Sequence, residues 1–259
     1  MLRTITATRY VTPLREGGSL PAIVEADDDG MYVVKFRGAG QGIKALIAEL
    51  VAGELARAAG LLMPELVLAE VDPVLGRMEA DSEIRALLTA SAGTNLALDY
   101  LPGAITFDPL ARPVPDAATA SAIVAFDAFV TNVDRTAKNP NLLCWHGQLW
   151  LIDHGAAFGF HHTWSDYRER SRTPFAFIRH HVLLPWADAV PAAWAALAER
   201  LTPVAISRAV TAIPEGWLGG EPFADAAAHR DAYVTYLLER LQAAPAFIEE
   251  AVRARAAIV

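Results

Sequence analysis

Short segments of apolar or alternating character fill the first hundred residues of the chain. Five of them are rich in β-branched and aromatic residues and predict strands, at 3–12, 20–26, 31–36, 65–71 and 94–100. The Gly17–Gly18 pair and the sequence DDDG at 27–30 predict tight turns between the first three strands. Residues 43–59 carry apolar side chains at the three- and four-residue spacing of an amphipathic helix, and 82–90 predicts a shorter helix.

The second part of the chain has a helical pattern. A segment dense in proline and glycine, YLPGAITFDPLARPVPDA at 100–117, separates it from the first part. Asp116 is placed to cap a helix that runs to about Thr131. The sequences LLCW and LWLID predict a hairpin around His146–Gly147, and three further helical segments follow at about 187–200, 203–212 and 225–256. We therefore predict an α+β fold with two lobes, an N-lobe at 1–103 and a C-lobe at 104–259.

Composition narrows the classes of function. The 259 residues are 53% hydrophobic and carry a formal net charge of −8, which argues against a nucleic-acid binder, because such proteins need a basic face. No segment reaches the roughly 18 consecutive apolar residues of a membrane span, and the N-terminus lacks the apolar stretch of a secretory signal. The single cysteine, Cys144, excludes an internal disulfide and favours a reducing, cytoplasmic setting.

One stretch concentrates polar side chains between a predicted helix and the predicted hairpin. It reads FDAFVTNVDRTAKNPNLL at 126–143. Asp134 and Asn139 are five positions apart, and Asp153 follows at the end of an apolar strand. Phosphoryl transfer requires such a set: one carboxylate orients the attacking hydroxyl and accepts its proton, while an amide oxygen and a second carboxylate hold magnesium. The pattern predicts Asp134 as the base and Asn139 and Asp153 as magnesium ligands.

Upstream residues extend this hypothesis to nucleotide binding. Lys35, within the strand YVVKF, is placed to hold nucleotide phosphates while paired to a glutamate on the following helix. We choose Glu49 as that partner, with Glu54 as the competitor because the helix face is not fixed by sequence. The Gly17–Gly18–Ser19 turn lies where phosphates would be covered, and Lys138 is a candidate for neutralising the transferred phosphate.

These motifs resemble the HipA-like kinases, an atypical family with the protein-kinase-like fold. The resemblance rests on six segments in the expected order: GGSLP (17–21), YVVKF (32–36), AELVAGELA (48–56), YLPGA (100–104), TNVDRTAKNPNLL (131–143) and LIDHG (151–155). It implies binding of ATP and Mg²⁺ and Ser/Thr protein kinase activity. The chain is shorter than the archetypal HipA toxin and lacks a counterpart of its extra N-terminal subdomain, which weighs against a toxin role and an antitoxin partner.

The sequence says less about where the nucleotide base binds and about which molecule accepts the phosphate. We expect adenine between the lobes, near Asp99, Tyr100 and Leu101, where backbone groups of the linker can bond its edge. An acceptor hydroxyl on a protein is favoured by the resemblance alone. A small-molecule kinase with the same site is one alternative. A nucleotide-binding pseudokinase is another, although a pure binder needs no base at Asp134.

Other motifs have simpler interpretations. The sequence GAGQGIK at 38–44 fails the P-loop pattern, because no glycine immediately precedes Lys44 and Ala45 replaces Ser or Thr, so it predicts a flexible strand-to-helix loop. The His161–His162 and His180–His181 pairs have no accompanying ligand cluster and are interpreted as structural or surface histidines.

Overall fold

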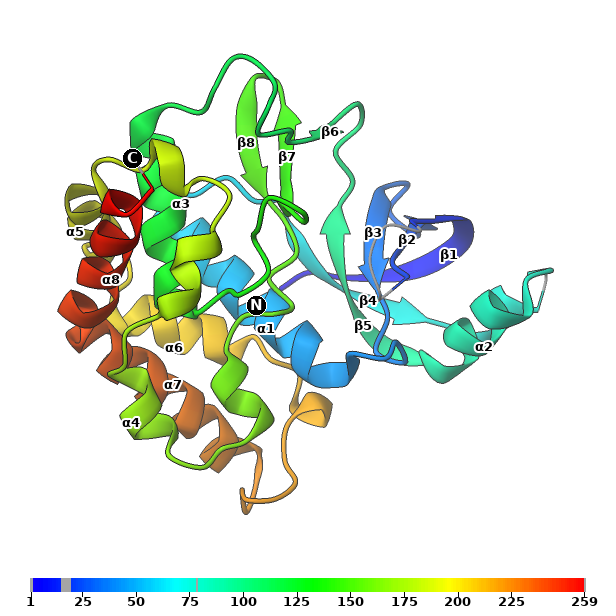
Figure 1. Ribbon diagram of the computed structural model, residues 1–259. Helices are drawn as coiled ribbons and strands as arrows, with labels where there is room; N and C mark the ends of the chain where they lie inside the picture. Colours follow the sequence, from blue (N-terminus) through cyan, green and yellow to red (C-terminus); the bar gives the residue numbers. More distant parts are fainter. Residues whose placement is uncertain (1, 15–19, 78, 259) are drawn as a thin grey trace.

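The computed structural model describes residues 2–14, 20–77 and 79–258, and it places a strand barrel beside a larger group of helices (Figure 1). Five strands form the barrel in the order β1-β2-β3-β5-β4. Their bounds are β1 (Thr4–Pro13), β2 (Ala22–Ala26), β3 (Met31–Lys35), β4 (Leu66–Val71) and β5 (Gly93–Asp99). The register of β1 against β2 shifts at two places, and β1 also pairs in parallel with β4. Such bulges bend a strand, which here lets β1 close the barrel.

Two helices accompany the barrel strands, α1 (Gly42–Ala59) and α2 (Ser82–Ala90). The loop that leads into α1 is held by side chains from the end of α2 and the start of β5. Asn95 Oδ1 accepts from the Arg37 N–H at 2.8 Å, and Ser91 Oγ accepts from the Gly38 N–H at 3.2 Å. A Cβ at Gly38 would lie 2.8 Å from Ala90 Cβ, so this close approach requires glycine.

The rest of the chain is mainly helical and also contains a small sheet in the order β6-β7-β8. The helices are α3 (Ala117–Val130), α4 (Tyr167–Ser171), α5 (Val190–Ala198), α6 (Pro203–Thr211), α7 (Ala226–Gln242) and α8 (Ala244–Ala256). The strands are β6 (Ile105–Thr106), β7 (Leu142–Trp145) and β8 (Gln148–Leu151). Short 3₁₀ helices connect them: η2 (Gly159–His162), η3 (Ala176–His180), η4 (Leu184–Trp186) and η5 (Glu215–Trp217), while η1 (Pro73–Gly76) precedes α2.

Most predicted elements are confirmed, with one clear exception. The single helix predicted at 225–256 was wrong, because the structure divides it into α7 and α8 at Ala243. Pro245 lies at the start of α8, where its missing N–H and its ring end the preceding hydrogen-bond ladder. The two-residue strand β6 and the short helix α4 were not predicted. The predicted division between residues 103 and 104 stays a prediction.

Helix α3 leads into the polar stretch, and both of its ends have defined caps. As predicted, Asp116 caps it, since its Oδ1 accepts from the Thr119 N–H at 2.8 Å. The helix ends at Thr131, which has left-handed backbone geometry (φ 56°). A β-branched residue is costly in that conformation, so the surrounding contacts must hold it there.

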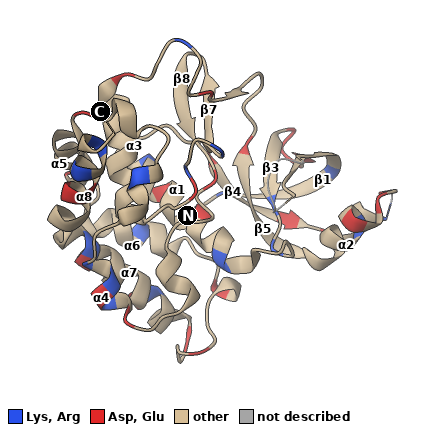
Figure 2. Cartoon of the chain, in the orientation of Figure 1, with Lys and Arg blue, Asp and Glu red and all other residues tan. Residues whose placement is uncertain are grey.

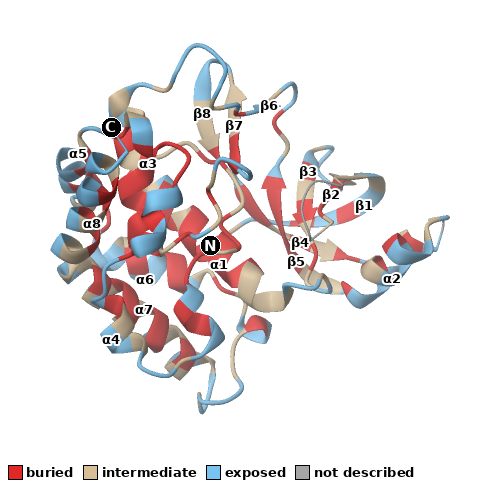
Figure 3. Ribbon diagram, in the orientation of Figure 1, coloured by how far each residue is buried: buried red, intermediate tan, exposed pale blue. Residues whose placement is uncertain are grey.

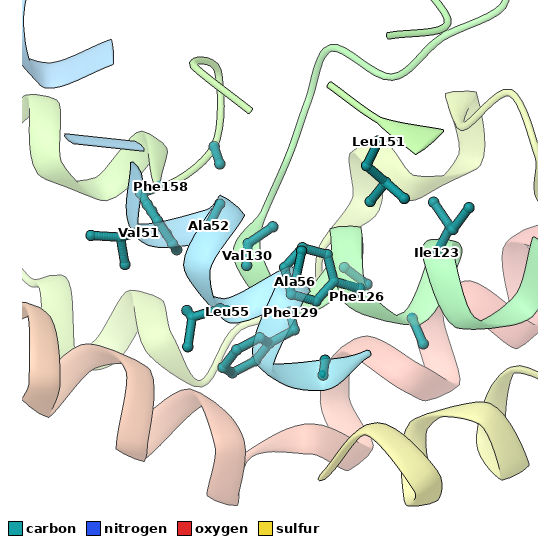
Figure 4. Packing of buried hydrophobic residues seen from close by; sticks show 14 of the residues in the cluster. Val51, Ala52, Leu55, Ala56, Ile123, Phe126, Phe129, Val130, Leu151 and Phe158 are labelled. Atoms are coloured by element: carbon teal, nitrogen blue, oxygen red, sulfur yellow. The ribbon is translucent and has the colours of Figure 1, made fainter. Parts of the chain in front are cut away.

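Buried side chains form two clusters (Figure 3). The smaller one fills the barrel and includes Val24, Val34 and Ala97. The larger one contains residues of α1, α3 and α5 to α8, together with Leu66, Leu96 and Leu98 of the barrel strands. Figure 4 shows Val51, Leu55 and Ala56 of α1 among Ile123, Phe126 and Phe129 of α3, with Leu151 and Phe158 nearby. Helix α1 therefore packs with the helical part of the molecule although its sequence lies between barrel strands.

Charged residues lie mostly on the outside of the helices, and Figure 2 shows cations and acids interleaved around α4 and α7. There, Glu239 pairs with Arg168 and, at 3.2 Å, with Arg172. Among the helices in the described ranges, none is long and apolar enough to cross a bilayer.

Arg240 is an exception, since it is buried and bonds only to neutral groups. It donates to four backbone carbonyls: Ala128 (2.8 Å), Phe129 (2.9 Å), Ser171 (3.0 Å) and Thr173 (2.8 Å). Its guanidinium also lies 4.5 Å from the ring centroid of Phe247. The side chain thus ties the end of α3 to the segment after α4.

We expect Arg240→Met to lower the free energy of unfolding by more than about 3 kcal/mol, because each buried carbonyl left without a donor costs roughly 1–3 kcal/mol. Urea unfolding measures this change. The matched control is Arg253→Met on α8, whose side chain is 70% exposed and which should change stability by less than about 0.5 kcal/mol. Equal stability of the two variants would show that the carbonyl contacts contribute little.

Candidate active site

Lys35, Glu49 and Asp153 meet at the junction of the barrel and the helices. The Lys35 Nζ donates to Glu49 Oε2 at 2.9 Å and to Asp153 Oδ1 at 2.6 Å. Lys35 ends β3, Glu49 lies in the middle of α1 and Asp153 follows β8, so three segments distant in sequence converge. The competing residue Glu54 lies beside Arg57 instead, at 3.6 Å.

Burial and charge act against each other in this trio. The Lys35 and Glu49 side chains are 12% and 0% exposed, whereas that of Asp153 is 39% exposed. Burial opposes the charge on Lys35, but the Glu49 and Asp153 carboxylates outweigh it and raise the pKa of Lys35. Burial also opposes the charge on Asp153 and by itself would raise the pKa of that carboxyl. The Lys35 ammonium and the Gly155 N–H outweigh burial and hold the pKa of Asp153 below its ordinary value. For Glu49, burial exceeds the attraction of Lys35 and raises its pKa.

A second group of polar side chains lies on the loop at 131–141 between α3 and β7, the polar loop, and consists of Asp134, Asn139 and Asn141. Asp134 Oδ2 accepts from Asn139 Nδ2 at 2.7 Å and from Asn141 Nδ2 at 3.3 Å. The same Asn141 nitrogen lies 3.5 Å from the backbone oxygen of Asp153. Asn141 therefore connects the loop to the segment that carries the second carboxylate.

Two residues of this region have left-handed backbone geometry, one just before β7 and one two residues after β8. Asn141 has a φ of 49° and Asp153 a φ of 55°, both in the left-handed region. Such geometry costs a non-glycine residue about 1–2 kcal/mol and persists only where neighbouring contacts enforce it. Strained residues concentrate at functional sites, and these two flank the β7–β8 hairpin on both sides.

A buried ion pair beneath the loop supplies those contacts. Arg135 and Asp127 have fully buried side chains, and the Arg135 Nε donates to Asp127 Oδ2. The Arg135 Nη1 also donates to the backbone oxygens of Asn141 and Ile152, the latter at 3.2 Å. One guanidinium thereby holds the loop, the residue before Asp153 and helix α3 together.

Together with Asp127 and Arg135, His154 and His181 form a buried frame, and each imidazole ring has a defined tautomer. The Arg135 Nη2 lies 2.9 Å from His154 Nε2, so that nitrogen accepts. His181 Nδ1 accepts from the Leu183 N–H at 3.0 Å, which leaves its Nε2–H to donate to Asp127 at 2.9 Å. Both rings are therefore neutral. Burial lowers the pKa of His154 to about 3 and also lowers the pKa of His181, against the opposing effect of Asp127.

Sequence reasoning missed most of this frame. Asp127, His181 and Asn141 were not candidate site residues. The available signal was Asp127 itself, because a carboxylate inside the apolar helix sequence AFDAFV is costly unless a cation is buried with it. The interpretation of His181 as structural agrees with its position, and no group of three or more His, Cys, Asp or Glu able to hold a metal occurs among the described residues.

The other predicted residues occupy more peripheral positions. Lys138 and Asn139 are exposed, and Lys138 forms no ion pair or hydrogen bond within the part of the chain that the structure describes. Asp99 is exposed, Tyr100 half-buried and Leu101 buried, at the end of β5. The predicted Gly17–Gly18–Ser19 contribution lies outside the described residues.

A pocket opens where the start of α1 faces Lys35 and Asp153. Residues from both sides line it: Lys35, Phe36, Ala39, Gln41, Gly42, Ala45, Leu46, Asp153 and Gly155. The 38–44 loop thus borders the site. A glycine is needed at Gly42, whose φ is 64°.

The buried histidines generate a pH prediction. An unfolded histidine titrates near pH 6.5, whereas burial lowers the pKa of His154 and of His161 to about 3 in the folded protein and also lowers the pKa of His181. Below pH 6.5 the unfolded state therefore binds more protons, and stability must fall as pH falls. We expect each of these histidines to lower the free energy of unfolding by up to about 1.4 kcal/mol per pH unit, a limit approached about one unit below pH 6.5, where the unfolded histidine is almost fully protonated.

Urea unfolding between pH 7 and pH 5 measures this slope. His181→Gln keeps an N–H donor near Asp127 but cannot titrate, so its stability should fall less steeply than that of the parent as pH falls, by up to about 1.4 kcal/mol per pH unit. Parallel pH profiles for parent and variant would contradict the assignment of His181 as a neutral buried group.

Known structures share this fold across almost the whole chain. The Helicobacter pylori proinflammatory kinase CtkA matches with a TM-score of 0.61 and 12% identity, covering 100% of this chain and 99% of CtkA. The Golgi casein kinase matches with TM-scores of 0.50 and, with Mn/ADP bound, 0.52, each at 12% identity and covering 96% of this chain and 73% of the other. These matches confirm an α+β kinase-like fold.

Sequence comparison gives the family. No curated protein sequence matches the chain. The sequence profile of the HipA-like kinases matches residues 8–250, which include the barrel strands, the polar loop and helices α3 to α7. The chain therefore belongs to the HipA-like kinase family.

Proposed function

We propose that this kinase transfers the γ-phosphoryl group of ATP, with Mg²⁺, to a Ser or Thr hydroxyl of a protein. The observation that supports the proposal most is the convergence of Asp134, Asn141 and Asp153 through the hydrogen bonds of one amide group. Because Asn141 contacts the Asp134 carboxylate and the Asp153 backbone, it supports an arrangement in which Asp134 serves the acceptor and Asp153 the metal, as phosphoryl transfer requires.

Lys35 is the residue that we assign to the nucleotide phosphates. Its ammonium already faces two carboxylates, and the exposed Asp153 contact can give way to a phosphate and a metal ion while the buried Glu49 contact holds the side chain in place. The backbone at the end of β5 is the proposed adenine site. The Asp99 and Tyr100 N–H groups are bonded to Glu65 O and Met31 O, whereas the Leu101 N–H has no partner among the described residues. We therefore assign the Leu101 N–H to the edge of the base.

Oxygen donors are available for Mg²⁺. Asn139 uses its Nδ2 on Asp134, which leaves its Oδ1 for a metal, and Asp153 has a partly exposed carboxylate. Hard oxygen ligands of this kind suit Mg²⁺, which keeps several of its waters. When bound, the ion would neutralise charge that develops on the phosphates. The Golgi casein kinase, solved with Mn/ADP bound, supports the use of a divalent metal and a nucleotide by this fold.

Asp134 is the residue that we assign to the acceptor hydroxyl. It orients the hydroxyl and takes its proton as the oxygen forms a bond to the γ-phosphorus, while the bond from that phosphorus to the bridging oxygen breaks and ADP leaves. Asn139 and Asn141 donate to one oxygen of the carboxylate, Oδ2, which fixes its orientation. The other oxygen, Oδ1, is left to face the acceptor.

Asp134→Asn should separate binding from chemistry. The amide keeps the size of the side chain but cannot accept the proton, so phosphotransfer should fall by about 10²–10⁴-fold while Mg-dependent ATP binding persists. Incubation of a cell lysate with labelled ATP measures transfer, and calorimetry with a non-hydrolysable analogue measures binding. Asp231→Asn, an exposed carboxylate on α7, is the matched control. Transfer by Asp134→Asn at the parent rate would exclude Asp134 as the base.

Asp153→Ala should weaken Mg-dependent nucleotide binding, because it removes a metal ligand rather than the base. We expect the gain in nucleotide affinity on adding Mg²⁺ to disappear, with the fold retained in circular dichroism. Calorimetric titrations with and without Mg²⁺ test this for parent and variant. An undiminished effect of Mg²⁺ in the folded variant would remove Asp153 from the metal site.

A further inference from the structure

A basic stretch lies beside the polar loop in a chain that is acidic as a whole. Residues 170–187 contain Arg170, Arg172 and Arg179 and no Asp or Glu, although the whole chain has 30 acidic against 22 basic residues. Arg170 donates to the backbone oxygens of Phe160 and Thr163, and Arg172 pairs with Glu239. Arg170 therefore has donors engaged by neutral oxygens and Arg172 has a carboxylate, whereas Arg179 is exposed and donates to neither a backbone oxygen nor a carboxylate among the described residues.

Hydrogen bonds fix this stretch to the polar loop. His181 and Thr136 form an antiparallel bridge, and the Val182 N–H donates to Arg135 O at 3.0 Å. The same Arg135 and His181 side chains hold Asp127 in the buried frame. The position of the stretch relative to Asp134 is therefore determined by buried contacts rather than by a free loop.

The helix η3, which appears in yellow-green in front of α3 in Figure 1, directs its side chains in a regular way. Phe175, just before it, and Ile178 are buried, whereas Phe177 is 60% exposed and Arg179 and His180 are exposed. With three residues per turn, Phe177 and His180 share a face, and their ring centroids are 6.5 Å apart. The Phe177 ring is thus exposed on a segment that buried neighbours hold in place.

Arg179 offers most of its donors to solvent. Its Nε donates to His180 Nε2 at 3.0 Å, and within the described ranges no carboxylate pairs with its guanidinium. Lys138, on the polar loop itself, is likewise unpaired among the described residues. Two cations without an ion pair among the described residues, Lys138 on the polar loop and Arg179 on the segment bridged to it, therefore accompany the exposed Phe177 ring, and carboxylates are the groups that complement such cations.

Chain geometry relates these residues to an acceptor. Arg179 is two residues from His181, which faces Thr136 across the bridge, and Thr136 is two residues from Asp134. An extended peptide spans about 3.3 Å per residue, so a segment of about five residues covers the distance from Asp134 to Arg179. A polypeptide can reach both places at once, whereas a small alcohol at Asp134 would leave Phe177 and Arg179 without a role.

We propose that the acceptor hydroxyl belongs to an acidic polypeptide segment, with a carboxylate paired to Arg179, a second acidic group near Lys138 and an apolar side chain against Phe177. This inference rests on the proposed phosphotransfer function and names the substrate class of the same site. The net charge of −8 repels acidic partners in general, so the local cations provide selection as well as attraction.

A positional-scanning library of Ser- and Thr-centred peptides, incubated with labelled ATP, tests the inference. The parent should favour Asp or Glu at one or more positions within about five residues of the acceptor, since that is the span to Arg179. Arg179→Glu should lose the preference at one of these positions and favour Lys or Arg there, with a change in kcat/KM of about fivefold for each side of the swap. Phe177→Ser should lose the preference for an apolar residue. Arg253→Glu, an exposed arginine on α8, should keep the preferences of the parent.

The possible failures are distinct. Phosphorylation of peptides without any acidic preference, or an acidic preference that survives Arg179→Glu in a folded variant, would overturn the inference and leave the kinase function standing. Transfer to small molecules of a lysate but to no peptide or protein would overturn both the inference and the protein-kinase assignment. Nucleotide binding without transfer to any acceptor would overturn the proposed function itself, and the inference with it.

Discussion

The buried ion pair between Asp127 and Arg135 is the interaction on which the site depends. Both side chains are fully buried. The pair is tolerated there because the nitrogens of Arg135 and the carboxylate oxygens of Asp127 have hydrogen-bond partners. Removing one member would leave the other as an uncompensated buried charge. The pair also holds the backbone at Asn141, whose left-handed geometry would relax without it. Asp134 therefore keeps its orientation through a residue seven positions earlier, in the last turn of the apolar helix α3.

Charge is distributed unevenly between the buried frame and the open site. In the frame, the Arg135 cation is neutralised by Asp127, and two neutral histidines fill the remaining space. In the open site, one ammonium at Lys35 faces the carboxylates of both Glu49 and Asp153, and Asp134 adds another nearby. With Glu49 and Asp153 both ionised, the Lys35 trio carries one negative charge in excess, which favours a cation beside it. The structure thus places rigid, balanced charges below the loop and unbalanced charges where ligands would arrive.

Sequence patterns predicted the strands, α1, α3 and the hairpin, because each has a local signature of period or turn chemistry. They also predicted the pairing of Lys35 with Glu49, since a lysine in an apolar strand needs a carboxylate from the next helix. The frame escaped prediction because its members come from four separate segments, and spacing along the chain says nothing about which of them meet. The division of the last helix escaped for a different reason: Pro245 was outweighed by a continuous apolar period on both sides of it.

Helix α1 is the element whose packing has the widest consequence. It belongs to the larger cluster of buried side chains, whereas β3 belongs to the barrel cluster. The bond from Lys35 to Glu49 therefore joins two separately packed cores, and the bond from Lys35 to Asp153 does the same. A small rotation of the barrel against α1 would lengthen both bonds at once, and it would also disturb the larger core, to which Leu66, Leu96 and Leu98 of the barrel strands belong. The lengths of the two Lys35 bonds therefore depend on how the barrel is aligned with the helices, so the packing of α1 determines whether the trio is assembled.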